Sequence, residues 1–192
     1  MIKQRFRSGF LWVLCLPLLA FAIPGASWAT FDVDSRLSVE LPAGVREVDV
    51  TKVNMPLPNT RLFMAQDTVG LYQVIRIDMS EEQGTALQGE AARQRYYDGV
   101  VNGAVNGQQE AVLLARTSFP TAAGEGIELK MRARHKGTGK LVVKYSRSLL
   151  LNHTGYAFLF IPLDKSDTAG ISGRAERERF FTSIKAKAAA TW

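Results

Sequence analysis

The sequence is almost without cysteine. Its one cysteine, Cys15, lies in an apolar N-terminal segment, and it follows Val13 and Leu14 rather than the small residues that precede a lipid-modified cysteine. No disulfide can therefore form within residues 30–192, although exported proteins often carry disulfides. The fold has to be held by a hydrophobic core, and 163 residues are enough for one.

No second long apolar run follows this N-terminal segment. The segment begins with Lys3, Arg5 and Arg7, continues as FLWVLCLPLLAFAI, and ends with small residues at Ser27 and Ala29. This order is typical of a secretory signal peptide, and the run is shorter than the roughly 20 residues of a membrane-spanning helix. We therefore expect residues 1–29 to be a cleaved signal peptide rather than an uncleaved anchor. Residues 30–192 should form one globular domain with no transmembrane segment, in the periplasm or secreted.

A strong excess of positive charge is also missing. The whole chain has 24 Lys and Arg against 18 Asp and Glu, but three of the basic residues belong to the expected signal peptide. The remaining chain has a formal charge of +3, whereas nucleic-acid-binding domains are usually more basic. The composition therefore argues against a nucleic-acid partner.

Motifs for catalysis or metal binding are absent as well. The two histidines, His135 and His153, belong to no ligand pattern such as H-E-x-x-H, and no G-x-S-x-G elbow is present. The stretch LDKSDTAG starts like a calcium loop at Asp164, but alanines stand where glycine and glutamate are required. We therefore expect turn formers here, no catalytic residue, no cofactor and no metal site, and we interpret the chain as non-enzymatic.

The remaining sequence has an α+β pattern. Alternating apolar residues predict strands at 31–41, 46–53, 61–66 and 70–79, and a helix over 86–101 that is capped by Thr85 and Gln88 and ends at Asn102-Gly103. Four strand-like runs follow, at 111–119, 126–134, 140–151 and 155–163, and a last helix spans about 173–188. This order favours a mainly antiparallel sheet.

The chain resembles the PsbP-like family of folds, which also includes DcrB-like bacterial envelope proteins. The resemblance rests on the early strand ending in VELPAG, the middle helix before four strands, and the closing helix with RFFTSIKA. It implies an antiparallel sheet with helices packed on both faces, as an α/β/α sandwich. It also implies an accessory or binding role, and it carries no functional residues across.

Residues 132–140, RARHKGTGK, end like a phosphate-binding loop. The template G-x-x-x-x-G-K-[ST] fails twice, because Arg134 stands at the first glycine and Leu141 follows Lys140. A hairpin explains the stretch better. The apolar residues of both flanking strands have odd numbers, which predicts a three-residue loop, Gly137-Thr138-Gly139, and places Arg132 opposite Lys144.

This register predicts a basic face. It is formed by Lys130, Arg132, Arg134, Lys136, Lys140 and Lys144. One interpretation is a solvated hairpin tip, whose charges also discourage edge-to-edge pairing. The other is a binding surface for an anionic partner.

Two functional hypotheses follow. The first is an exported, non-enzymatic periplasmic accessory or binding protein whose partner is another envelope protein or an anionic envelope component. The alternative is a small-ligand carrier, or an enzyme whose site forms only in the tertiary structure. A deep pocket with converging polar groups would favour the alternative.

Overall fold

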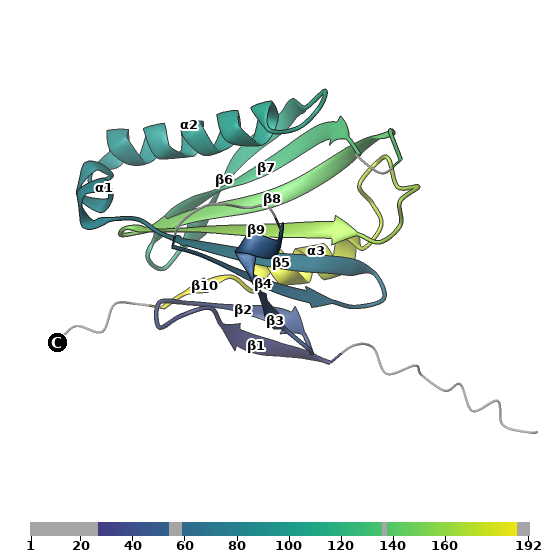
Figure 1. Ribbon diagram of the computed structural model, residues 1–192, viewed down its shortest axis with the longest axis horizontal. Helices are drawn as coiled ribbons and strands as arrows, with labels where there is room; N and C mark the ends of the chain where they lie inside the picture. The colour runs from purple at the N-terminus through teal and green to yellow at the C-terminus, as the bar shows by residue number, and fades with distance from the viewer. Residues whose placement is uncertain (1–26, 54–58, 136–137, 188–192) are drawn as a thin grey trace, which may run out of the picture.

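The computed structural model describes residues 27–53, 59–135 and 138–187 (Figure 1). Most of the expected signal peptide, residues 1–26, lies outside this part of the chain. Strand β1 (Trp28–Asp32) begins two residues before Thr30, the expected mature N-terminus. The proposed boundary between signal peptide and domain therefore stays a prediction.

The main structural unit is a seven-stranded antiparallel sheet in the order β3-β4-β5-β9-β8-β7-β6. Its members are β3 (Arg46–Val48), β4 (Thr60–Gln66), β5 (Gly70–Asp78), β6 (Val112–Thr121), β7 (Gly124–Arg134), β8 (Leu141–Leu151) and β9 (Thr154–Pro162). The four strand-like runs of the second half correspond to β6–β9. The prediction of a mainly antiparallel sheet is thus confirmed.

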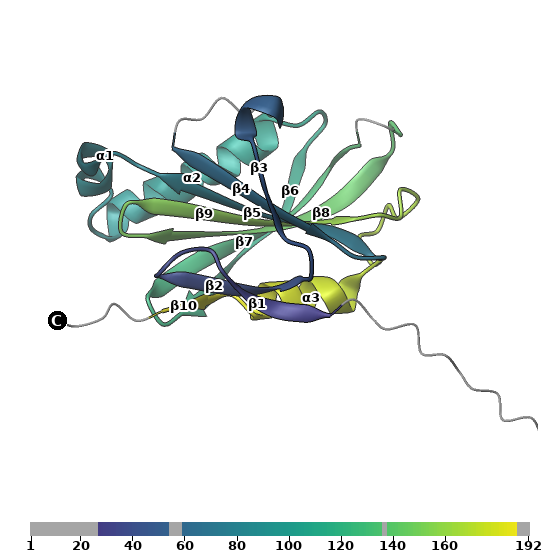
Figure 2. The same cartoon turned by 60° about the horizontal axis from the view of Figure 1, so that its bottom comes forward.

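Two layers flank this sheet. Helix α2 (Glu90–Asn106) follows the short α1 (Glu81–Ala86) and packs over Leu129, Met131 and Leu150. On the opposite side lie α3 (Arg174–Thr182) and a three-stranded sheet of β1, β2 (Leu37–Pro42) and β10 (Lys185–Ala186) (Figure 2). This second layer therefore combines one helix with strands, which differs from a purely helical layer.

The larger core lies between the main sheet and the layer containing α3. Phe180 is completely buried there, and its ring centroid lies 5.4 Å from that of Tyr72 in an edge-to-face arrangement. Phe158 and Phe181 pack in the same cluster. Burying these aromatic side chains stabilises the fold, each by about 1.5–3 kcal/mol relative to exposure, so the aromatic pair of the last helix anchors α3 to the sheet.

Three expected helix boundaries are wrong. The last helix does not continue to about 188, since α3 ends at Thr182 and Lys185–Ala186 form β10. The capping box is formed by Ser80 and Gln83 at the start of α1, not by Thr85 and Gln88. Helix α2 continues through Gly103 to Asn106, because Ala104 and Val105 still pack on the apolar cluster of the sheet. A short 3-10 helix, η1 (Val50–Val53), replaces the end of the expected strand 46–53.

Candidate functional site

The pairing of β7 with β8 differs by one residue from the expected register. Arg132 lies opposite Val143, and Lys144 lies opposite Met131. The prediction that Arg132 faces Lys144 is therefore wrong. The predicted three-residue loop is wrong for the same reason, because Arg134 pairs with Leu141 and an even number of residues lies between them. The physical reason is that both faces of β8 are covered, with Leu149, Leu150 and Leu151 all buried, so the alternation of apolar residues does not mark one face.

The corrected register divides the expected basic face. Lys130, Arg132 and Arg134 remain together on the side of the sheet that carries α3, because alternate residues share a face. Lys144 belongs to the other side, where its Nζ donates to Gln108 Oε1 at 2.5 Å. Lys140 is exposed beside the turn, whereas Lys136 and Gly137 lie outside the described residues.

Arg134 is occupied by neighbouring groups. Its Nε donates to Glu110 Oε1 at 2.7 Å, and its guanidinium also donates to the carbonyl of Gly139. This side chain therefore ties the end of β7 to the segment before β6. Lys130 and Arg132 of the expected face lie together on the side of α3 and stay candidates for binding an anion, while the exposed Lys140 lies apart from them beside the turn.

A cavity of about 470 Å³ lies beside Lys130, between β7, β8 and α3. We call it the basic groove. It is lined by Glu128, Lys130, Tyr145, Arg147, Ala169, Gly170, Ile171, Arg174, Arg177, Glu178, Phe181 and Thr182. Four of these side chains are cationic and two are acidic, so the groove carries net positive charge.

Arg177 is the central cation of the groove. Its side chain is only 8% exposed, its Cζ lies 3.7 Å from the centre of the Tyr145 ring, and its Nη1 donates to the Gly170 carbonyl at 2.7 Å. No carboxylate of the described residues pairs with it. In the same part of the chain no buried side-chain nitrogen lacks a hydrogen-bond partner, so the remaining donors of Arg177 reach solvent.

The other cations of the groove differ in whether a carboxylate pairs with them. Arg147 Nε lies 2.6 Å from Glu128 Oε2, and Arg174 Nε lies 2.7 Å from Glu178 Oε1. Lys130 contacts no carboxylate among the described residues, and its Nζ lies 5.6 Å from the centre of the Tyr145 ring. Lys130 and Arg177 thus both lie near the Tyr145 ring and line the same groove without a paired carboxylate among the described residues, so they can attract the same anionic group.

The loop at 164–172 forms one wall of the groove. Asp167 accepts hydrogen bonds from the backbone N–H groups of Ala169, Gly170 and Ser172. Burial acts to raise the pKa of Asp167, but these hydrogen bonds outweigh it and leave the pKa below its ordinary value. Asp167 is thus a turn former, as expected, and it fixes the carbonyl that holds Arg177.

Sequence reasoning missed Arg177, although a signal for it exists. Arg177, Phe180, Phe181 and Ile184 recur at the spacing i, i+3, i+4 and i+7, which places them on one helical face. An arginine on the apolar stripe of a helix must find polar partners inside the fold. That conflict could have marked Arg177 as a special residue.

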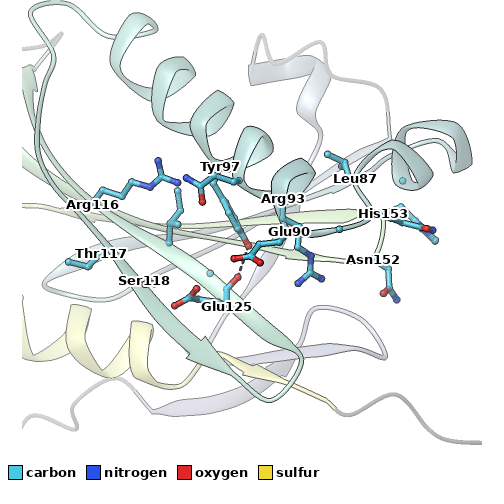
Figure 3. Close-up of a pocket in the computed structure, with 16 residues that line it drawn as sticks. Leu87, Glu90, Arg93, Tyr97, Arg116, Thr117, Ser118, Glu125, Asn152 and His153 are labelled. Carbon is cyan, nitrogen blue, oxygen red and sulfur yellow. Dashed lines mark hydrogen bonds between the residues drawn. The ribbon is translucent and has the colours of Figure 1, made fainter.

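A second, larger cavity of about 820 Å³ lies on the opposite side of the sheet (Figure 3). We call it the polar cleft. It is bounded by α1, the first turns of α2, β6, β7 and the Asn152–His153 turn. His153 lines it, while His135 lies at the hairpin, where its Nδ1 is 3.2 Å from the Thr138 backbone nitrogen.

Within residues 27–53, 59–135 and 138–187, no three His, Cys, Asp or Glu side chains lie close enough together to hold a metal ion. No helix of that same part is long and apolar enough to cross a membrane.

Comparison with solved structures shows that the chain has a PsbP-like fold. Cyanobacterial PsbP (CyanoP) from Synechocystis, solved in solution, matches with a TM-score of 0.53 and 16% sequence identity, covering 86% of this chain and 96% of that protein. A crystal structure from Bacteroides thetaiotaomicron is more distant, with a TM-score of 0.39, 14% identity, and coverage of 81% of this chain and 46% of the other. No protein-family model matches the chain, and no curated protein matches it. The similarity therefore concerns the fold alone.

Proposed function

We propose that this chain is an exported accessory protein that binds an acidic segment of another envelope protein in the basic groove. The observation that carries the proposal is the pair of cations, Lys130 and Arg177, that both lie near the Tyr145 ring and form no ion pair with a carboxylate of the described residues. The PsbP-like fold is compatible with an accessory role. The proposal keeps Lys130 and Arg132 from the expected basic face and replaces Lys144 with residues of α3.

A protein partner fits the groove better than a uniformly charged surface does. Ile171 is 67% exposed at its rim, and Phe181 and Ala169 also line it. Arginine, tyrosine and phenylalanine, all of which line the groove, are enriched at the centre of protein interfaces. An acidic segment with an apolar residue would therefore pair with the cations and cover Ile171 together.

The experiment compares capture of envelope proteins by two double variants. Lys130→Gln with Arg132→Gln removes one cation that lines the groove and the next exposed cation on the same face of β7, while Arg46→Gln with Arg95→Gln removes two exposed cations elsewhere and serves as the matched control. We expect the groove variant to bind its partner at least about tenfold more weakly. Binding by the wild type should also weaken as salt rises, because exposed charges are screened beyond about 8 Å at physiological ionic strength.

Three results would contradict this function. The first is equal capture by both double variants. The second is binding that does not respond to salt. The third is retention by vesicles of anionic lipid, or by an acidic polysaccharide, with no captured protein, because a general anionic surface would then be the partner.

A further inference from the structure

The polar cleft is a second site, on the face of the sheet opposite to the basic groove. Arg116 and Ser118 of β6 face this side because they pair with Leu129 and Ile127, which pack under α2. The Asn152–His153 turn, which lines the cleft, can lie close to α1 because residue 84 is glycine. A Cβ at Gly84 would lie 2.3 Å from the Cβ of His153, so a larger residue would push α1 away.

The cleft contains charges of both signs that do not neutralise one another. Arg93 and Glu90 come from the first turns of α2, and Glu125 comes from β7 (Figure 3). None of the three forms an ion pair with a described residue, whereas Arg116 is held by Asp98 at 2.6 Å. Glu90 and Glu125 are exposed and Arg93 is half-buried, and all three line the same cavity.

The guanidinium of Arg93 is positioned so that it can contact a ligand in the cleft. Its Nη1 lies only 3.1 Å from where a Cβ of Gly124 would be, so the glycine of the β6–β7 turn leaves room for it. Helix α2 begins at Glu90, and the residue before it, Gly89, has no side chain to cap the first N–H groups. Free N–H groups at a helix start and a nearby guanidinium both favour a carboxylate.

The floor of the cleft is fixed by Tyr97. Its hydroxyl donates to the Glu125 carbonyl at 2.8 Å and accepts from the Leu150 backbone nitrogen at 3.1 Å. These two bonds hold Glu125 and α2 at a constant separation. The backbone of Glu125 and helix α2, which carries Arg93, therefore belong to one rigid frame, and a pre-organised frame lowers the cost of binding a small ligand.

We propose that the polar cleft binds a short peptide through its free termini. Arg93 binds the C-terminal carboxylate, and Glu125 with Glu90 binds the N-terminal ammonium. A ligand with both charges satisfies all three residues, whereas a simple anion leaves the two carboxylates facing each other. The volume of about 820 Å³ lies in the upper range of ligand sites and exceeds the needs of one amino acid.

The test is calorimetric titration of the domain with tri-alanine and its blocked forms. Tri-alanine with free termini should bind, and the form with an acetylated N-terminus and an amidated C-terminus should bind at least about tenfold more weakly. Arg93→Gln should weaken binding of free tri-alanine but leave binding of the C-amidated peptide unchanged, because that contact is already lost. Glu125→Gln should show the same relation with the N-acetylated peptide.

Arg95→Gln is the matched control, because Arg95 is exposed on the same helix and does not line the cleft. It should bind tri-alanine like the wild type. Equal binding of the free and doubly blocked peptides would overturn the proposal, as would no heat with tri-alanine at millimolar concentration. Binding of sulfate that Arg93→Gln abolishes and Glu125→Gln leaves intact would show a simple anion site instead. These results are independent of the basic groove, which lies on the other face.

Discussion

At the level of a single residue, Arg177 has a structural role, and in the function we propose it also has a binding role. Its guanidinium stacks on Tyr145 and donates to Gly170, while the remaining donors face the basic groove. Lysine would keep the charge but lose the planar stacking and the fixed direction of the donors. The conservative exchange Arg177→Lys therefore separates charge from geometry.

We expect Arg177→Lys to lower the free energy of unfolding by about 1–2 kcal/mol, the sum of a lost buried stacking contact and one hydrogen bond. Urea denaturation measures this change. Arg174→Lys is the control, because the Arg174 side chain is 69% exposed and its loss should change stability little. Equal stability of Arg177→Lys and the wild type would mean that the stacking contributes nothing.

Asp34 is the residue from which we predict a dependence on pH. Its carboxylate accepts from the Tyr156 hydroxyl at 2.6 Å and from the backbone of Arg36 and Leu37 at 2.8 and 3.0 Å. Burial acts to raise the pKa of Asp34, but these hydrogen bonds and the guanidiniums of Arg36 and Arg76 hold the pKa below its ordinary value. A lowered pKa in the folded state stabilises the fold above the unfolded pKa, about 4, and this stabilisation is lost as the pH falls through the folded pKa.

Asp34→Asn should therefore lower the free energy of unfolding by about 2 kcal/mol at neutral pH, the range for hydrogen bonds to a charged group. The difference from the wild type should shrink as the pH falls below about 4. Urea denaturation at neutral and acidic pH measures both values. A difference of the same size at both pH values would show that the ionised carboxylate is not what stabilises the turn.

At the level of elements, strand β1 bears on where the mature chain begins. Trp28 belongs to β1, its ring centroid lies 5.1 Å from that of Tyr72, and the Arg179 guanidinium carbon lies 4.6 Å from its centre. Cleavage after Ala29 would remove this side chain. A domain starting at Ser27 should therefore be about 1–2 kcal/mol more stable than one starting at Thr30, through the aromatic pair and the cation–π contact.

Urea denaturation of the two domains measures the difference, and intact mass of the exported protein shows which N-terminus the cell produces. A mature chain that still contains Trp12 would mean that the segment is an uncleaved anchor. Equal stability of the two domains would mean that Trp28 adds nothing to the core.

The elements themselves were largely predictable from the sequence, and their pairing was not. The order of strands and helices follows from apolar periodicity, which local chemistry determines. The register of β7 with β8 could not be read in this way, because residues on both sides of β8, such as Ser148 and Leu149, are buried. The basic groove depends on α3 approaching Tyr145 from 32 residues further along the chain, and this contact is set by tertiary packing.

At the level of the whole molecule, one sheet separates two cavities of different character. The basic groove carries uncompensated cations and an exposed isoleucine, while the polar cleft carries charges of both signs. Variants in one cavity should leave binding at the other unchanged, because residues on opposite faces that share no partners act independently. An accessory protein with this arrangement could hold a protein partner and a small ligand at the same time.

Photo-crosslinking in living cells tests the central claim most directly. A photoreactive amino acid at position 171, at the rim of the basic groove, should form a covalent adduct with an envelope protein on illumination. The same amino acid at Ala91, exposed on α2 over the other face, should not form that adduct. Loss of the adduct in the Lys130→Gln, Arg132→Gln background would support the groove as the docking site. An adduct from position 91 and none from position 171 would contradict the account.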